Sequence, residues 1–223
     1  MIALSNVCKT YSSHRGQIPV VRDISFEIAS ARSLALMGRS GSGKTTLLYL
    51  IGGLERPDSG EIICFDKSVH SMTSRNLAMF LRQHVGFMFQ FGNLLSFLTV
   101  AENIAFPLRL NGISGRSCSS RVQELLEKVG LADAAKAMPA ELSGGEIQRI
   151  AFARAIAHHP LLLLADEPTA SLDSGTANTL MHLMFTVGRQ EGRTTIVATH
   201  DPDVSAMSDK VLHLRDGRLA DGR

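Results

Sequence analysis

Short apolar segments alternate with longer amphipathic ones along most of this chain. Residues 2–8 and 20–28 alternate apolar and polar positions, which predicts two strands with Arg15, Gly16 and Gln17 in the loop between them. Residues 33–37 are short and apolar enough for a buried strand. The same reasoning predicts further strands at residues 61–65, 85–89, 161–165 and 194–198, and a closing hairpin turn at Asp216-Gly217.

Helical periods separate these strands. Apolar residues at positions 47, 48, 50 and 51 can supply the buried side of one helix. Positions 122, 125, 126 and 129 share the face of a second helix, which Gly130 ends. Residues 147–158 and positions 180, 183, 184 and 187 predict two more helices. Strands that alternate with helices indicate an α/β fold with a mainly parallel sheet.

A glycine-rich loop lies between the strand at 33–37 and the helix after it. It fits the pattern GxxxxGK[ST], whose backbone N–H groups bind phosphate oxygens, whose lysine reaches the β- and γ-phosphates and whose last hydroxyl binds Mg²⁺. The loop would hold phosphate at a helix N-terminus, where unpaired donors and the helix dipole favour anions. A glycine-rich turn without a ligand is the alternative, and the strand–loop–helix context disfavours it. The candidate residues are Gly38, Arg39, Ser40, Gly41, Ser42, Gly43, Lys44, Thr45 and Thr46.

Two acids follow the apolar run LLLLA. Asp166 ends a segment typical of a central parallel strand, so it would reach the ion that Thr45 binds, through water. Glu167 faces another direction from the strand end and can polarise the attacking water as general base. A helix cap without chemistry is the alternative for this acid pair. With the phosphate loop upstream, phosphate-anhydride hydrolysis is the favoured interpretation.

Composition limits the possible partners and compartments. The 223 residues are enough for one sizeable domain, and the net charge of +2 comes from 23 basic and 21 acidic residues in mixed order, so no nucleic-acid partner is expected. Three widely spaced cysteines without a CxxC indicate a reducing compartment. We find neither a secretory signal nor an apolar run long enough to span a bilayer, so a membrane role would require another chain for the spanning.

Six of the ten phenylalanines fall between Phe80 and Phe106. Within this interval the segment 91–98, from Phe91 to Leu98, is apolar but has neither a strand nor a helix period. Irregular apolar segments of this kind form either core or a partner surface, and the residues alone leave both open.

The ordered set of motifs resembles the ATP-binding subunits of ABC transporters over nearly the whole chain. It consists of GRSGSGKT, a glutamine after an apolar strand, LSGGE, LLLLADE, Ser-Leu-Asp at 171–173 and Thr-His-Asp at 199–201. LSGGE upstream of an apolar strand that ends in Asp-Glu distinguishes this family, because other phosphate-loop proteins lack that motif. The segments GFMFQFGNLL, LTVAENIAFPL and ELSGGEIQRIAFARA are similar to the subfamily that powers lipoprotein release and macrolide export, in which the ATPase is a separate small chain.

This resemblance implies a substrate, a cofactor and roles for matching residues. ATP would bind with Mg²⁺; Tyr11 would stack on adenine, where a half-buried aromatic at a strand end is the plainer alternative. Gln90 would contact Mg²⁺ and water while sensing a partner, and His200 would contact the γ-phosphate. Catalytic roles thus fall to Lys44, Gln90, Glu167 and His200, and Mg²⁺ ligation to Thr45, Gln90 and Asp166.

A second copy of the chain is the first partner that the resemblance implies. Ser143, Gly144 and Gly145 would bind the γ-phosphate of ATP held by the opposite copy in a head-to-tail dimer, with Asp173 at the seam. The segment itself agrees, because a second glycine-rich helix N-terminus needs an anion and nothing else in this chain provides one.

The resemblance also implies a fold and a location. We expect a P-loop NTPase with a RecA-like core, an N-terminal antiparallel β part and an inserted α-helical subdomain. The single domain 2–223 would divide into 2–90 and 156–223 for the core and 91–155 for the helices. Integral membrane permease subunits would dock near residues 91–98, so the protein would be peripheral on the cytoplasmic face of the inner membrane.

The same motifs are compatible with two other functions. A regulatory ABC ATPase that signals through a membrane protein without transport has the same motifs. A soluble ABC ATPase without a permease fits less well, because such proteins carry long coiled coils or tandem domains and this length leaves no room for either.

Some positions depart from the family pattern without removing a catalytic group. Ala31 and Arg32 replace Gly-Glu, and Ala170 and Ser171 replace a frequent Gly-Asn. Arg39 replaces a common proline and adds a cation beside the phosphates, which can alter nucleotide affinity.

Overall fold

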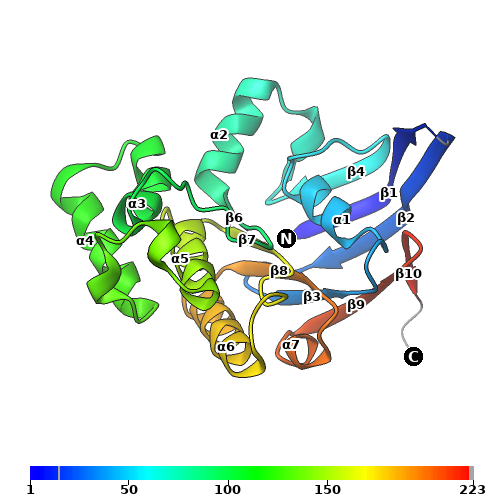
Figure 1. Ribbon diagram of the computed structural model, residues 1–223. Helices are drawn as coiled ribbons and strands as arrows, with labels where there is room; N and C mark the ends of the chain where they lie inside the picture. Colours follow the sequence, from blue (N-terminus) through cyan, green and yellow to red (C-terminus); the bar gives the residue numbers. More distant parts are fainter. Residues whose placement is uncertain (15, 221–223) are drawn as a thin grey trace.

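Two β-sheets and the helices around them form the structure, a computed structural model that describes residues 1–14 and 16–220. Arg15, expected in the first loop, and residues 221–223 lie outside the described residues. The first sheet has the order β2-β1-β4-β5 and the second the order β10-β9-β3-β8-β7-β6. Figure 1 shows the antiparallel strands at one end of the molecule and helices α3 and α4 at the other.

The antiparallel sheet is built from β1 (Ile2–Ser13), β2 (Gly16–Ile28), β4 (Ser59–Cys64) and β5 (Lys67–Ser68). The first two strands are longer than expected. Gly16 and Gln17 already belong to β2, and Tyr11 pairs with Ile18 within the sheet instead of lying in a connection. The expectation of a loop there was wrong because backbone pairing of β1 with β2 continues through polar, exposed positions, where apolar alternation is not needed.

The second sheet carries the mainly parallel core. Its strands are β3 (Ser33–Met37), β6 (Val85–Met88), β7 (Leu162–Asp166), β8 (Thr194–Thr199), β9 (Lys210–Arg215) and β10 (Arg218–Ala220). Strands β9, β3, β8, β7 and β6 run parallel, and β10 adds an antiparallel edge after the turn at Asp216-Gly217. The expected α/β fold with a P-loop, a mainly parallel core and an antiparallel part is therefore confirmed.

Both faces of the parallel sheet are buried, each by a different layer. Alternate residues of β7 point to opposite faces. Leu162 and Leu164 pack with α1 and the antiparallel strands, whereas Leu163 and Ala165 pack with the helices of the middle region. This two-sided burial explains why every residue of β7 and β8 is buried instead of every second one.

Seven helices occur among the described residues. They are α1 (Lys44–Ile51), α2 (Ser74–His84), α3 (Val100–Leu110), α4 (Gly115–Lys128), α5 (Gly144–Ile156), α6 (Ser174–Gln190) and α7 (Pro202–Ala206), and short 3-10 turns lie at Val69–Ser71, Ala132–Ala134 and Pro139–Glu141.

Helices α2 and α3 were not predicted as separate elements. In α2, Leu77, Phe80 and Leu81 share one face at helical spacing, a signal that was present in the sequence but was not used. Helix α3 contains Pro107, a residue that argues against a helix interior, and its start depends on a capping box between Thr99 and Glu102.

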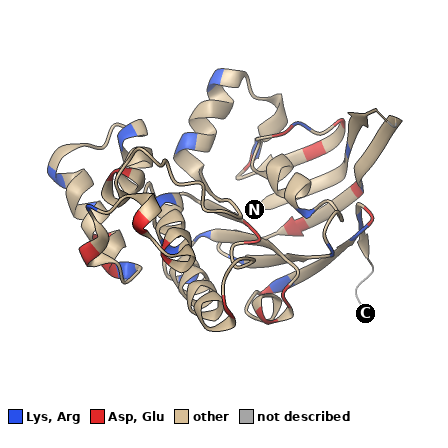
Figure 2. Cartoon of the chain, viewed as in Figure 1, with Lys and Arg blue, Asp and Glu red and all other residues tan. Residues whose placement is uncertain are grey.

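Charge and hydropathy of the folded chain agree with its composition. Figure 2 shows basic and acidic residues interspersed over the helices and both sheets. Within residues 1–14 and 16–220, no helix combines the length and apolarity needed to cross a membrane.

Candidate active site

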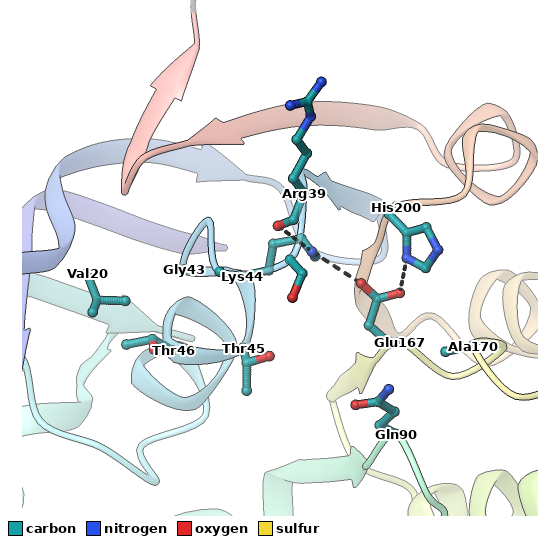
Figure 3. A pocket seen from close by; sticks show the side chains of 12 residues that line it. Val20, Arg39, Gly43, Lys44, Thr45, Thr46, Gln90, Glu167, Ala170 and His200 are labelled. Atoms are coloured by element: carbon teal, nitrogen blue, oxygen red, sulfur yellow. Dashed lines mark hydrogen bonds and ion pairs between the residues drawn. The ribbon is translucent and has the colours of Figure 1, made fainter.

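A cavity of about 650 Å³ opens beside the phosphate loop, at the carboxyl ends of the parallel strands (Figure 3). Segments far apart in the sequence meet there, as expected at this edge of an open α/β sheet. The lining residues are Val20, Arg39, Ser40, Gly41, Gly43, Lys44, Thr45, Thr46, Gln90, Glu167, Ala170 and His200.

The backbone of the phosphate loop requires glycine at two positions. Gly41 has φ 78° and Gly43 has φ 102°, in the left-handed region that side chains disfavour. A Cβ on Gly43 would also lie 2.6 Å from the carbonyl oxygen of Val20, which belongs to β2. The loop therefore passes close to the antiparallel sheet before α1 begins at Lys44, and its amides can surround an anion at the start of that helix.

The side chain of Lys44 folds back onto this loop. Its side chain is only 6% exposed, and Nζ donates to the carbonyl oxygens of Gly38 at 2.7 Å and Arg39 at 3.2 Å. Nζ also lies 3.2 Å from Oε1 of Glu167. The Lys44 side chain thus bonds to its own loop and to an acid across the cavity. In the same position it could bind phosphate oxygens in place of Glu167.

Thr45 and Asp166 come together at the floor of the site. The Thr45 hydroxyl donates to Oδ1 of Asp166 at 3.1 Å. Burial is the largest effect on the pKa of Asp166 and raises it, and the negative charge of Glu167 raises it further. The hydrogen bond from Thr45 and the charge of Lys44 lower the same pKa. A buried carboxylate whose ionised form is disfavoured, next to a hydroxyl, is a suitable place for a divalent cation.

Glu167 bonds to other partners than Asp166 does. Its φ is 45°, and its amide donates to the carbonyl oxygen of Ala198 on β8 at 2.9 Å. Its Oε2 lies 2.8 Å from Nδ1 of His200, which follows β8 directly. Figure 3 shows Glu167 between Lys44 and His200.

Gln90 reaches the cavity from the end of β6, and α5 holds its backbone. The buried Gln148 donates through Nε2 to the carbonyl oxygen of Gln90 at 2.5 Å. Two turns later Arg154 donates to the carbonyl oxygens of Asn93 and Gly92, both at 2.7 Å. Residues 90–93 and helix α5 are therefore bonded at three points, none of which was expected from the sequence.

The second glycine-rich segment forms a separate helix start. Ser143 caps α5: its hydroxyl accepts from the amide of Glu146, whose carboxylate accepts from the Ser143 amide at 2.8 Å and hydroxyl at 2.6 Å. These bonds lower the pKa of Glu146. Ser143, Gly144 and Gly145 do not line the 650 Å³ cavity, so within one chain the two glycine-rich motifs stay apart.

Five other predicted site residues also lie outside the lining of this cavity. One is Asp166, which bonds to the lining residue Thr45. Tyr11 sits in β1 with Nζ of Lys9 5.4 Å from its ring centroid, and Asp173 caps α6 by accepting from the Thr176 amide. Gly38 and Ser42 instead line a recess of about 820 Å³ on the side of the loop toward β9 and β10.

Val20 and Ala170 line the cavity but were not among the predicted site residues. Val20 is a strand residue whose position depends on β2 passing the loop, and no local signal marks it. Ala170 comes shortly after the strand-end acids. Its departure from the family's Gly-Asn pattern was the signal that could have marked it as a cavity residue.

Comparisons with known proteins agree with this geometry. A sequence profile of the ABC transporter family matches residues 21–170, more than half of the chain. The chain belongs to the ABC transporter family. It is 42% identical over 219 residues to the uncharacterized ABC transporter ATP-binding proteins MT1014 and Rv0986 from two strains of Mycobacterium tuberculosis, a match that covers 98% of this chain and 88% of each relative.

Solved structures of ABC cassettes share the whole fold. The bacterial ABC transporter cassette MJ0796 in a dimeric structure has a TM-score of 0.92 and 36% identity, over 98% of this chain and 96% of that one. A dimeric post-hydrolysis state of the same cassette bound to ADP and Pi has the same TM-score with 35% identity and the same coverage. This ABC protein is accordingly an ATPase.

Proposed function

We propose that this ABC ATPase binds ATP between two copies of itself and uses hydrolysis to drive a separate membrane permease. The observation that carries the proposal is the division of the site. Lys44, Thr45, Glu167 and His200 line one cavity, whereas the helix start at Ser143 is exposed and lies outside that lining. Two copies arranged head to tail would bring the missing half to each cavity, and the MJ0796 cassette was solved as a dimer.

ATP would bind along the phosphate loop. The amides of residues 38–46, with Lys44, would hold the β- and γ-phosphates, and Tyr11 in β1 would stack on adenine. The glycine-only backbone at Gly41 and Gly43 supports this, because it leaves the amides accessible. Ser143, Gly144 and Gly145 of the second copy would complete the γ-phosphate site, with Asp173 at the seam.

The residues present fit a magnesium ion. Thr45, Asp166 and Gln90 offer a hydroxyl, a carboxylate and an amide oxygen, the hard donors that Mg²⁺ prefers. When bound, the ion would neutralise phosphate charge as the anhydride breaks. Binding beside Asp166 would also favour the ionised form that burial disfavours.

Glu167 would act as the general base. Its carboxylate borders the cavity, and its bond with His200 fixes one oxygen. ATP would take over the charge of Lys44 and so release the other oxygen to accept a proton from the attacking water. His200 would contact the γ-phosphate, and Gln90 would orient water and report on the neighbouring segment.

A permease would dock at the segment 91–98. The side chains of Phe91 and Phe97 are 72% and 74% exposed, which favours the docking alternative for them, whereas Phe80 is core at 3%. A groove of about 490 Å³ adjoins them between α2, α3 and α5 and includes Arg154. Arg154 bonds this segment to α5, and Gln148 bonds the preceding Gln90 to the same helix. Displacement at the groove would therefore move both Gln90 and Ser143.

The remaining features of the proposal follow the subfamily resemblance. Transport would be of the export or lipoprotein-release type, and the protein would sit peripherally on the cytoplasmic face of the inner membrane. Residues 2–90 and 156–223 would form the core and antiparallel part of a single domain, and residues 91–155 its helical subdomain.

The test is isolation of the membrane partner. Tagged protein carrying Glu167→Gln, which should hold ATP, is purified from membranes of the source cell with ATP present, and proteins that copurify are identified. An integral membrane protein should copurify, and Phe91→Ser with Phe97→Ser should remove it, while Met79→Ser on the exposed side of α2 should not. Absence of any integral membrane partner would overturn the permease role.

A further inference from the structure

Arg39 is an exposed cation on the phosphate loop with no ion-pair partner among the described residues. Its backbone carbonyl accepts from Lys44, but its guanidinium extends away from Lys44 and Glu167 (Figure 3). Lys44, the other cation of the loop, is buried and paired with Glu167. The charge of Arg39 is therefore not used within the chain, although it stands at the rim of the nucleotide cavity.

The helix starts at Ser143 and Asp173 lie side by side. A Cβ on Gly145 would come within 2.7 Å of Cγ2 of Thr176, so the first turns of α5 and α6 are in contact. In the proposed head-to-tail dimer, Ser143–Gly145 cover the phosphates held by the other copy. The first turn of α6 would then face a neighbouring part of the same phosphate loop, on which Arg39 is exposed.

Two acids stand at these helix starts, and they differ in how free they are. Glu146 is half-buried and accepts from both the amide and the hydroxyl of Ser143. Asp173 is exposed, and its Oδ1 accepts from the Thr176 amide at 3.0 Å. The Thr176 bonds hold the pKa of Asp173 below its ordinary value, so it is ionised at neutral pH. Asp173 is thus the more accessible carboxylate.

We propose that Arg39 of one copy forms an ion pair with the partner subunit's Asp173, once at each nucleotide site of the dimer. The inference rests on the proposed head-to-tail dimer and names a contact that closes it. It also gives Arg39 a role in partner choice: an ABC chain without this cation and acid would pair less well with this one.

The experiment exchanges the two charges between copies. In the Glu167→Gln background with Mg²⁺ and ATP, Arg39→Glu alone and Asp173→Lys alone should each weaken self-association by about tenfold or more, because like charges then face each other twice per dimer. A one-to-one mixture should recover dimers that contain one chain of each kind. In such a mixed dimer one contact has the charges reversed and the other is native. Differently sized tags and light scattering after size exclusion distinguish the mixed species.

A double-mutant cycle with milder changes controls for local damage. Asp173→Asn keeps an N-cap side chain while removing the charge, and Arg39→Gln removes the cation without adding an acid. The double variant should associate about as strongly as the weaker single one. Binding of a fluorescent ATP analogue to each monomer checks that the nucleotide site persists.

Three outcomes separate the hypotheses. Failure of the charge-exchanged mixture to recover dimers, or additive effects in the cycle, would overturn the ion pair. Recovery with Glu146→Lys but not with Asp173→Lys would assign the contact to the other acid and also overturn it. A parent Glu167→Gln protein that stays monomeric with ATP would instead contradict the dimer itself.

Discussion

The carboxylate of Glu167 lies 2.8 Å from Nδ1 of His200, although the two side chains come from different strand ends. Its second oxygen is 3.2 Å from Nζ of Lys44. One acid therefore connects the loop cation with the histidine across the cavity. This arrangement requires a redistribution of charge when phosphate oxygens approach Lys44.

Replacement of Glu167 by glutamine should separate ATP binding from hydrolysis. The amide keeps the size of the side chain but cannot take a proton, so we expect kcat to fall about 100-fold or more while ATP-bound dimers accumulate. Steady-state phosphate release and size exclusion with ATP measure the two effects. Glu61→Gln, on an exposed position of β4, should leave both unchanged, and turnover at the parent rate in Glu167→Gln would contradict the role of base.

The Thr45 hydroxyl should determine the requirement for Mg²⁺. Thr45→Val preserves shape but removes the oxygen that bonds Asp166, so the Mg²⁺ concentration for half-maximal hydrolysis should rise by about tenfold or more. Thr45→Ser restores a hydroxyl and should return the midpoint close to the parent value. Equal Mg²⁺ midpoints in the valine and parent proteins would remove Thr45 from the proposed ligand set.

Hydrolysis should depend on protein concentration. Since Ser143–Gly145 lie outside the cavity of their own chain, a monomer has half a site and should bind nucleotide but turn it over poorly. The rate per molecule should therefore decline on dilution, while binding of a fluorescent ATP analogue should not. Fast turnover at dilutions where light scattering detects no dimers would contradict the shared site.

His158 should make the fold less stable in mild acid. Burial is the largest cause that lowers the pKa of this side chain, to about 4, and Nε2 lies 3.2 Å from the carbonyl oxygen of Val85. In the unfolded chain His158 is protonated below about pH 6.5, whereas in the folded protein it stays neutral until about pH 4. The stability that is present above pH 6.5 is therefore lost as the pH falls toward 4. Between pH 7 and pH 5 this effect lowers the free energy of unfolding by about 2 kcal/mol.

The matched variant for this effect is His158→Gln, which can still donate to Val85 but does not titrate. Its free energy of unfolding in urea should fall less between pH 7 and pH 5 than that of the parent. His14→Gln, at an exposed position, should behave like the parent. Equal pH dependence in His158→Gln and parent would show that His158 is not the titrating group.

Local patterns determined most of the fold and half of the site. The strand at Ser33–Met37 agrees with its prediction, and the phosphate loop follows it because glycine, lysine and hydroxyl residues at fixed spacing impose one backbone path. Asp166 and Glu167 follow from strand alternation in the same way. Such features depend on neighbours in the sequence, so one chain segment contains the information that specifies them.

Tertiary structure alone decided what those residues bond to. The pairing of Glu167 with His200 and Lys44, the hold of Gln148 and Arg154 on residues 90–93, and the approach of Val20 to the loop all join segments distant in sequence. Tyr11 falls outside the strand predicted at residues 2–8 but lies in β1 for the same reason, because its pairing partner Ile18 comes from β2. Contacts of this kind depend on how sheets and helices pack, so the hydrophobic period of a single segment does not predict them.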